Sequence, residues 1–143
     1  MKKTISLFLL LVLISPTQSA DIPETVAKSS VFPDFGTNVF IFDSSMSMDV
    51  VQKKCDIIFE QQEKSQFGKN RYAFLFKPGQ YNVDVNVGYY TQVCGLGLLP
   101  DDVIIKGAVR SEGDWSRGNV TQNFWRACEN LAIIPTENNI TPP

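Results

Sequence analysis

The stretch that decides the fold runs from Arg71 to Gly97 and reads RYAFLFKPGQYNVDVNVGYYTQVCGLG. It opens with an apolar run from Tyr72 to Phe76, which has the length of a buried strand. The Pro78-Gly79 pair then predicts a tight turn, because proline fixes φ and glycine tolerates positive φ. We expect several short strands that stack into one β core.

The residues after this turn alternate strictly between apolar and polar. The apolar members are Tyr81, Val83, Val85 and Val87, and the polar members between them are Asn82, Asp84 and Asn86. A period of two predicts a strand with one buried face and one wet face. Further apolar runs predict strands over residues 38–42, 93–97, 103–109 and 124–134.

A single amphipathic helix is predicted between the first two strands. Met48, Val51, Cys55 and Ile58 recur at helical spacing, and the residues 43–45 supply N-cap candidates. We expect the helix to end near Gly68. Because the terminal unit of a repeat fold must be covered, we assign this helix as the N-terminal cap of the stack.

Composition excludes several kinds of active site. The 143 residues include no histidine and three cysteines, so a Ser-His-Asp nucleophile, an imidazole zinc site and a four-thiolate zinc site are all excluded. We therefore predict no metal and no cofactor. The formal net charge is −2 and no basic run is present, which argues against nucleic acid as a partner.

The first twenty residues have the pattern of a secretory signal peptide. Lys2 and Lys3 precede an apolar run from Ile5 to Ile14, and small residues follow up to Ala20. The run is too short to span a membrane, so we expect a secreted, extracellular protein with no membrane attachment after cleavage. We assign residues 1–20 as the signal peptide, 21–36 as an extended lead-in, 37–135 as the capping helix and first coils, and 136–143 as a polar tail.

Four blocks of the chain resemble a family of large secreted microbial proteins. They are FLFKPGQYNV, TQVCGLG, DDVIIKGAV and TQNFWRACENLAIIP, and the similarity runs from Phe35 to Pro135. That family has the right-handed parallel β-helix fold of the pectin-lyase type and is assumed to act on carbohydrate. The resemblance thus implies a mainly β chain that begins such a helix. Relatives continue through many more coils, so the resemblance implies that this chain holds about the first three of them.

Two functions follow from this resemblance. The first is the N-terminal portion of a polysaccharide-acting protein, a glycoside hydrolase or lyase, whose catalytic part lies beyond Pro143. The second is a non-catalytic secreted module that binds glycans or builds extracellular structure. In both cases a polysaccharide or glycan is the expected partner. The open end of the coil stack also predicts self-association, because unpaired strand edges invite pairing.

No catalytic residue can be assigned, because the acidic residues have the spacing of turns and solvated strand faces. For contact with a sugar, the candidates are aromatic or acidic residues near loops: Tyr89, Tyr90, Asp114 and Trp115. Trp125, in contrast, is predicted to lie in the core. Gly95 and Gly97 do not form a nucleotide-binding loop, because Pro100 stands where a third glycine is needed.

The cysteines and two asparagines are candidates for covalent modification. Cys94 and Cys128 occupy comparable points of QVCGLGLLP and RACENLAIIP, so they are the candidates for a disulfide between coils. The alternative is that both are small buried residues with no bridge. Asn119 and Asn139 begin N-glycosylation signals, which matter only if the host is a eukaryote.

Overall fold

The structure is a computed structural model that describes residues 33–114 and 117–136. From Asp34 onward these residues belong to one compact unit. Its elements are β1 (Val39–Phe42), α1 (Met48–Gln62), β2 (Tyr72–Phe76), β3 (Gly79–Tyr81), β4 (Asp84–Asn86), β5 (Thr91–Gly95), η1 (Pro100–Asp102), β6 (Val103–Lys106), β7 (Ala108–Arg110), η3 (Val120–Gln122), β8 (Arg126–Glu129) and β9 (Ala132–Ile134).

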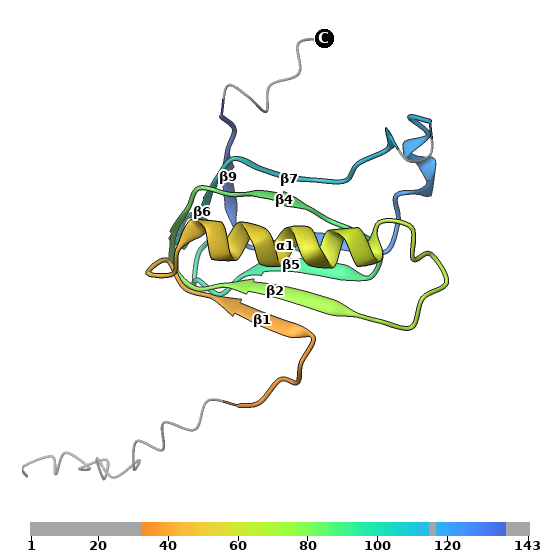
Figure 1. Cartoon of the computed structure of the whole chain (residues 1–143). Helices are drawn as coiled ribbons and strands as arrows, with labels where there is room; N and C mark the ends of the chain where they lie inside the picture. The colour runs from red at the N-terminus through yellow and green to blue at the C-terminus, as the bar shows by residue number, and fades with distance from the viewer. Residues whose placement is uncertain (1–32, 115–116, 137–143) are drawn as a thin grey trace, which may run out of the picture. The chain divides into compact units, whose positions relative to one another are not determined.

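The strands form three parallel sheets that the chain visits in rotation (Figure 1). Sheet A has the order β1-β2-β5-β8, sheet B the order β3-β6-β9, and sheet C pairs β4 with β7. From β2 onward the chain passes from sheet A to B to C and returns to A one strand further along. Every pairing is parallel. The expected mainly β fold of stacked parallel strands with one helix is therefore confirmed.

The predicted strand over Tyr81 to Val87 is divided between two sheets. Tyr81 ends β3, Asp84 begins β4, and the chain turns a corner at Asn82 and Val83. All four apolar residues of the alternation are still buried, at 4% exposed or less. The alternation survives the corner because the interior of the stack lies on the same side of both strands.

Two other predicted strands are also broken by corners. Residues 103–109 form β6 and β7, which are separated by Gly107 with φ 152°. Residues 124–134 form β8 and β9, which are separated by Asn130 with φ 53°. The strand from Tyr72 to Phe76 is confirmed as predicted, and the strand predicted over 93–97 begins earlier, at Thr91.

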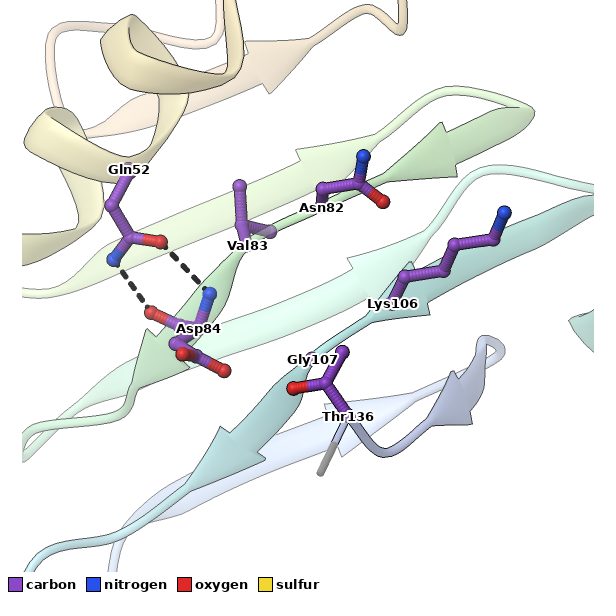
Figure 2. Close-up of a pocket in the computed structure, with 7 residues that line it drawn as sticks. All are labelled: Gln52, Asn82, Val83, Asp84, Lys106, Gly107 and Thr136. Carbon is purple, nitrogen blue, oxygen red and sulfur yellow. Dashed lines mark hydrogen bonds between the residues drawn. The ribbon is translucent and has the colours of Figure 1, made fainter. Parts of the chain in front are cut away.

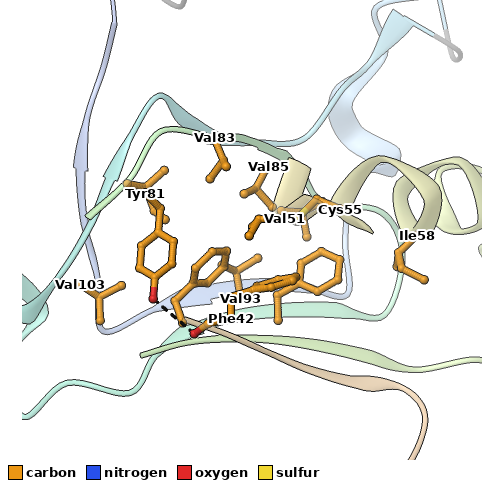
Figure 3. Packing of buried hydrophobic residues seen from close by; sticks show 13 residues of the cluster. Phe42, Val51, Cys55, Ile58, Tyr81, Val83, Val85, Val93 and Val103 are labelled. Carbon is orange, nitrogen blue, oxygen red and sulfur yellow. Dashed lines mark hydrogen bonds between the residues drawn. The ribbon is translucent and has the colours of Figure 1, made fainter. Parts of the chain in front are cut away.

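Aromatic rings fill the interior between the sheets and α1 (Figure 3). Phe42 lies 4.9 Å from Phe76, centroid to centroid, and Phe76 meets the ring of Tyr81 edge to face at 4.9 Å. From the helix, Val51 and Cys55 point into the same cluster. The buried Tyr81 hydroxyl donates to the carbonyl of Lys77 at 2.8 Å, so its polar end is satisfied.

The helix lies alongside β4 (Figure 1), and two glutamines connect it to the strands. The Gln52 side-chain amide donates to the carbonyl of Asp84 at 2.7 Å and accepts from its N–H at 2.8 Å. The side-chain amide of Gln62 donates to the backbone carbonyl of Tyr89 at 2.7 Å. The backbone carbonyl of Gln62 accepts from the Tyr89 N–H at 2.9 Å. This tie fixes the end of the helix at Gln62, six residues before the predicted end at Gly68.

The predicted N-cap is also corrected. The N-cap position is Ser47, whose side chain makes no capping hydrogen bond. The Asp43 carboxylate instead accepts from the N–H of Ser45 at 3.0 Å and from the Lys77 ammonium at 3.1 Å. Asp43 therefore closes the turn after β1 and does not cap α1.

Some predicted segments lie outside the described residues: the signal peptide (1–20), the lead-in up to residue 32, and the polar tail beyond Thr136. Within the described ranges, no helix has the length and apolar character that crossing a membrane requires.

Candidate functional site

An aromatic ladder runs along the corner that precedes sheet A. The register pairs Tyr72 with Thr91 and Thr91 with Arg126, so the residues just before them, Arg71, Tyr90 and Trp125, are equivalent in successive coils. The Tyr90 and Trp125 rings stack with centroids 5.1 Å apart and planes 13° apart. The Arg71 guanidinium lies 3.4 Å from the Tyr90 centroid.

Backbone hydrogen bonds hold this ladder in an unusual conformation. Tyr90 and Trp125 have φ of 54° and 58°, in the left-handed region that bulky residues rarely adopt. The N–H of Tyr90 donates to the carbonyl of Trp125 at 2.8 Å, and the N–H of Tyr72 donates to the carbonyl of Tyr90 at 3.0 Å. Stacking and hydrogen bonding between coils together offset the strain of the two corners.

The predicted sugar-contact tyrosines do not offer free ring faces. Tyr89 is 0% exposed, and its hydroxyl donates to the carbonyl of Gln122 at 2.6 Å. Tyr90 is half-buried between its neighbours in the ladder, Arg71 and Trp125. Protein groups thus already contact both rings, and their contact with a sugar stays a prediction. The prediction that Trp125 is core is wrong, because Trp125 is 53% exposed.

A cation lies against the buried tyrosine. The Arg126 guanidinium is 4.1 Å from the Tyr89 centroid, and its Nε donates to the carbonyl of Val87 at 2.7 Å. Burial lowers the pKa of Arg126, which the neighbouring Tyr89 partly offsets. Arg126 thus supplies the hydrogen bond that a backbone carbonyl at this corner needs. Sequence patterns gave no signal for this role.

Of the other predicted sugar-contact residues, Asp114 is exposed in the loop after β7, and its carbonyl accepts from the N–H of Arg117 at 3.0 Å. Trp115 lies outside the described residues. No contact joins Asp114 to the tyrosines among the interactions of the described ranges. Asp114 therefore stays a prediction as a sugar contact.

A polar hollow of about 170 Å³ opens where β3 turns into β4 (Figure 2). It is lined by Gln52, Asn82, Val83, Asp84, Lys106, Gly107 and Thr136. Amide, carboxylate, ammonium and hydroxyl groups of this kind hydrogen-bond the hydroxyls of a sugar. Its volume is below the roughly 300–1,000 Å³ of an ordinary small-molecule pocket.

The hollow owes its shape to the same contacts that hold the helix. The Gln52 amide is held against the Asp84 backbone by the two hydrogen bonds drawn in Figure 2. Asn82 and Lys106 are exposed at its rim. Gly107 forms part of the wall, where a side chain would clash with the carbonyl of Val83. Sequence reasoning missed these residues, because the corner that joins them was not predicted.

Among the described residues, no catalytic pair of carboxylates is evident. Asp102 accepts from the N–H of Leu99 at 2.8 Å, which confirms its expected role in a turn. Glu112 pairs with Arg110 at 2.8 Å, and Glu129 accepts from Gln92 across β5 and β8. In the described ranges there is also no group of three or more metal-ligating side chains.

All three cysteines are free thiols in the structure. The register pairs Cys94 with Glu129 and Cys128 with Val93, so the two predicted bridge partners lie one position apart on opposite faces of sheet A. Side chains that point apart do not form a disulfide without backbone movement, which is why the predicted bridge is not formed. Cys55 is buried, and burial raises its pKa to about 12.

The glycosylation candidate Asn119 is exposed, and its side-chain amide oxygen accepts from the N–H of Thr121 at 3.1 Å. Asn139 lies outside the described residues. Modification of both asparagines stays a prediction.

Comparison with known proteins identifies a relative that acts on glucan. No protein-family model matches the chain. An exo-β-1,3-glucanase from Streptomyces sp. strain SirexAA-E is 50% identical over 103 residues, which are 71% of this chain and 17% of that protein. The chain thus spans about a sixth of the length of the relative it matches.

Two solved structures share the fold. The structure of sacteLam55A from Streptomyces sp. SirexAA-E matches with a TM-score of 0.69 and 49% identity, over 72% of this chain and 19% of that chain. A variant of sacteLam55A in complex with glucose matches with a TM-score of 0.70 and 48% identity, over 74% of this chain and 19% of that chain.

These relatives correct the family expected from the sequence. The assignment to pectin-lyase-type proteins is wrong, because the protein matched over 103 residues is an exo-β-1,3-glucanase. The coarser expectation, a similarity to part of a larger polysaccharide-acting protein, is confirmed.

Proposed function

We propose that this chain forms one closed end of a parallel β-helix in a protein that acts on β-1,3-glucan. The observation that carries the proposal is the 50% identity over 103 residues to an exo-β-1,3-glucanase. The catalytic groups of such a protein would lie outside the described residues. In support, the carboxylates Asp102, Glu112 and Glu129 have local hydrogen-bond partners and face no second acid across a cleft.

The proposed β-helix is right-handed and α1 is its cap. Parallel strands of one sheet are joined by right-handed crossovers in about 98% of cases. The cap is supported by the Gln52 amide, which takes the position next to β4 that another strand would occupy. It is also supported by the burial of Val51, Cys55 and Ile58 against the core.

Assay of the purified chain on a soluble β-1,3-glucan tests this proposal. We expect no release of glucose or of reducing ends, with the glucanase relative as the positive control. Glucose release that is lost on Asp114→Asn or Glu129→Gln would contradict the proposal, because it would place the catalytic acid within these coils.

A second candidate is glucan binding without cleavage, which the polar hollow favours. Gel electrophoresis in the presence of β-1,3-glucan would show retarded migration that Lys106→Ala reduces and Lys69→Ala leaves unchanged. Lys69 is a matched control because it is also exposed but does not line the hollow. Equal migration with and without glucan would exclude glucan binding by this chain. It would not affect the first proposal, that the chain is one end of a β-helix.

We further propose that the protein is secreted, since residues 1–20 have the pattern of a signal peptide. Mass spectrometry of the protein from culture medium would then show a chain that begins near Asp21. Secreted protein that retains Met1 would contradict cleavage.

A further inference from the structure

The loop of residues 63–71, between α1 and β2, presents an exposed aromatic ring among cations. Figure 1 shows this loop extending beyond the end of α1. Phe67, at its middle, is 87% exposed, although phenylalanine is among the residues most often buried. Lys64, Lys69 and Arg71 are exposed as well. The loop thus holds three cations and one acid, Glu63, whereas the whole chain has a formal net charge of −2.

Hydrogen bonds fix the backbone on both sides of the Phe67 ring. Before it, the Tyr90 hydroxyl donates to the carbonyl of Gln66 at 2.7 Å. After it, the N–H of Gly68 donates to the carbonyl of Ser65 at 3.0 Å. These bonds use the backbone and leave the ring of Phe67 outside, so the fold presents the ring to the surroundings and does not pack it.

The charge of Arg71 is held in place at the end of the same loop. Its Nη1 donates to the carbonyls of Gly68 and Asn70, both at 2.9 Å, and its guanidinium lies 3.4 Å from the Tyr90 centroid. A side chain that is already ordered loses little further freedom when it meets an anion. Lys69 adds a second exposed cation between the two residues that Arg71 bonds.

This combination suits a polymer of sugar rings that carries acidic groups. An exposed aromatic ring offers an apolar face on which a sugar ring can stack. Lysine and arginine form charge-assisted hydrogen bonds with carboxylate and phosphate groups. A small ligand would be buried little against so exposed a ring, whereas a polymer gains from several weak contacts at once.

A lipid bilayer is the less favoured anionic partner. Binding to a bilayer scales with the apolar area that inserts, and even one acyl chain, which is larger than a phenylalanine side chain, gives only marginal membrane binding. The residues on either side of Phe67 are Gln66 and Gly68, which add no apolar side chain to the tip. The loop therefore offers too little apolar area for stable attachment to a membrane.

We propose that the loop of residues 63–71 binds an acidic polysaccharide. A sugar ring stacks on Phe67, and acidic groups of neighbouring sugars pair with Lys69 and Arg71. This ligand differs from the one considered for the polar hollow, because β-1,3-glucan is uncharged and offers these cations no partner.

Affinity gel electrophoresis of the full chain in carboxymethylated β-1,3-glucan tests this site, with the unmodified glucan as the uncharged comparison. We expect the charged polymer to retard the chain more than the neutral one. Phe67→Ala and Lys69→Ala should each raise the dissociation constant for the charged polymer about threefold, as the loss of one exposed contact does. Phe67→Tyr keeps the ring and should keep the binding. The polar hollow would bind the shared glucan backbone, so the difference between the two polymers reports on the loop.

Two variants are matched controls. Leu98→Ala removes an apolar side chain that is 92% exposed but lies in a turn with the acidic residues Asp101 and Asp102. Lys53→Ala removes an exposed cation from α1. Both should leave the dissociation constant unchanged. Because all of the replaced side chains are exposed, circular dichroism should show every variant folded.

Four outcomes would overturn the proposal. Equal retardation by the charged and neutral polymers would remove the role of the cations, and an unchanged dissociation constant for Phe67→Ala would remove that of the ring. A loss on Lys53→Ala as large as that on Lys69→Ala would indicate general charge attraction. Sedimentation with vesicles of phosphatidylcholine and phosphatidylglycerol that Phe67→Ala abolishes would identify a bilayer as the partner. None of these outcomes depends on cleavage of glucan.

Discussion

Replacing Gln62 by methionine should destabilise the fold although no apolar contact is lost. Methionine is unbranched and similar in length, so it fills the same space without the amide. Gln62 is 1% exposed, and its amide donates to the carbonyl of Tyr89 at 2.7 Å and to that of Asn70 at 3.3 Å. Water cannot replace a donor at such a buried position.

The size of the effect follows from the acceptors left behind. A buried acceptor that loses its partner costs about 1–3 kcal/mol. The Tyr89 carbonyl keeps one weaker donor, the hydroxyl of Thr91 at 3.3 Å. We therefore expect Gln62→Met to lower the free energy of unfolding by about 2 kcal/mol, the middle of that range.

Urea unfolding followed by circular dichroism measures this difference, with Gln61→Met as the control. Gln61 is the adjacent residue of the same type, but it is exposed and its side chain only accepts from the Tyr72 hydroxyl at 3.1 Å. An exposed bond of this kind should cost less than about 1 kcal/mol. Equal losses for the two variants would refute the reasoning that the buried amide ties the helix to the sheets.

Three further predictions concern the helix, a turn and a corner. Val51→Asp puts a charge at a position that is 0% exposed and should prevent stable folding, whereas Lys53→Ala should leave the thermal melt unchanged. The hydrogen bond from the Ser45 N–H is the main reason that the pKa of Asp43 is lowered to about 2 from its ordinary 3.8. The resulting stabilisation should be complete above about pH 5 and lost as the pH falls through the folded pKa, and Asp43→Asn should remove this part of the pH profile of unfolding. Gly107→Ala should cost at least about 1 kcal/mol in urea unfolding, because φ is 152° there and a side chain would meet a backbone carbonyl.

Hydrophobic alternation predicted burial correctly but did not predict the corners. The apolar positions from Tyr81 to Val87 are all buried, yet they belong to two sheets. A period of two reports which side of the chain faces the interior, and that side does not change when the backbone bends around the interior. Only the corner between β2 and β3 was predicted, from the Pro78-Gly79 pair, whereas Gly107 was placed inside a predicted strand.

Contacts between coils could not be predicted, because the coils differ in length. Arg71, Tyr90 and Trp125 form one ladder, although the intervals between them are unequal. The similarity of QVCGLGLLP to RACENLAIIP aligned Cys94 with Cys128, but the register places Cys128 beside Val93. An error of one position reverses the face of the sheet, and it therefore changes the chemistry that a pair of residues can perform.

The glutamines explain how a helix can close a stack of strands. A helix uses its own backbone groups internally, so it cannot pair with the free edge of a sheet as a strand does. The side-chain amide of Gln52 carries an N–H donor and a carbonyl acceptor next to each other, as a peptide group does. It makes with Asp84 the two bonds that a neighbouring strand would make, at 2.7 and 2.8 Å. In the proposed β-helix this substitution prevents another strand from pairing with β4, so sheet C can extend only beyond β7.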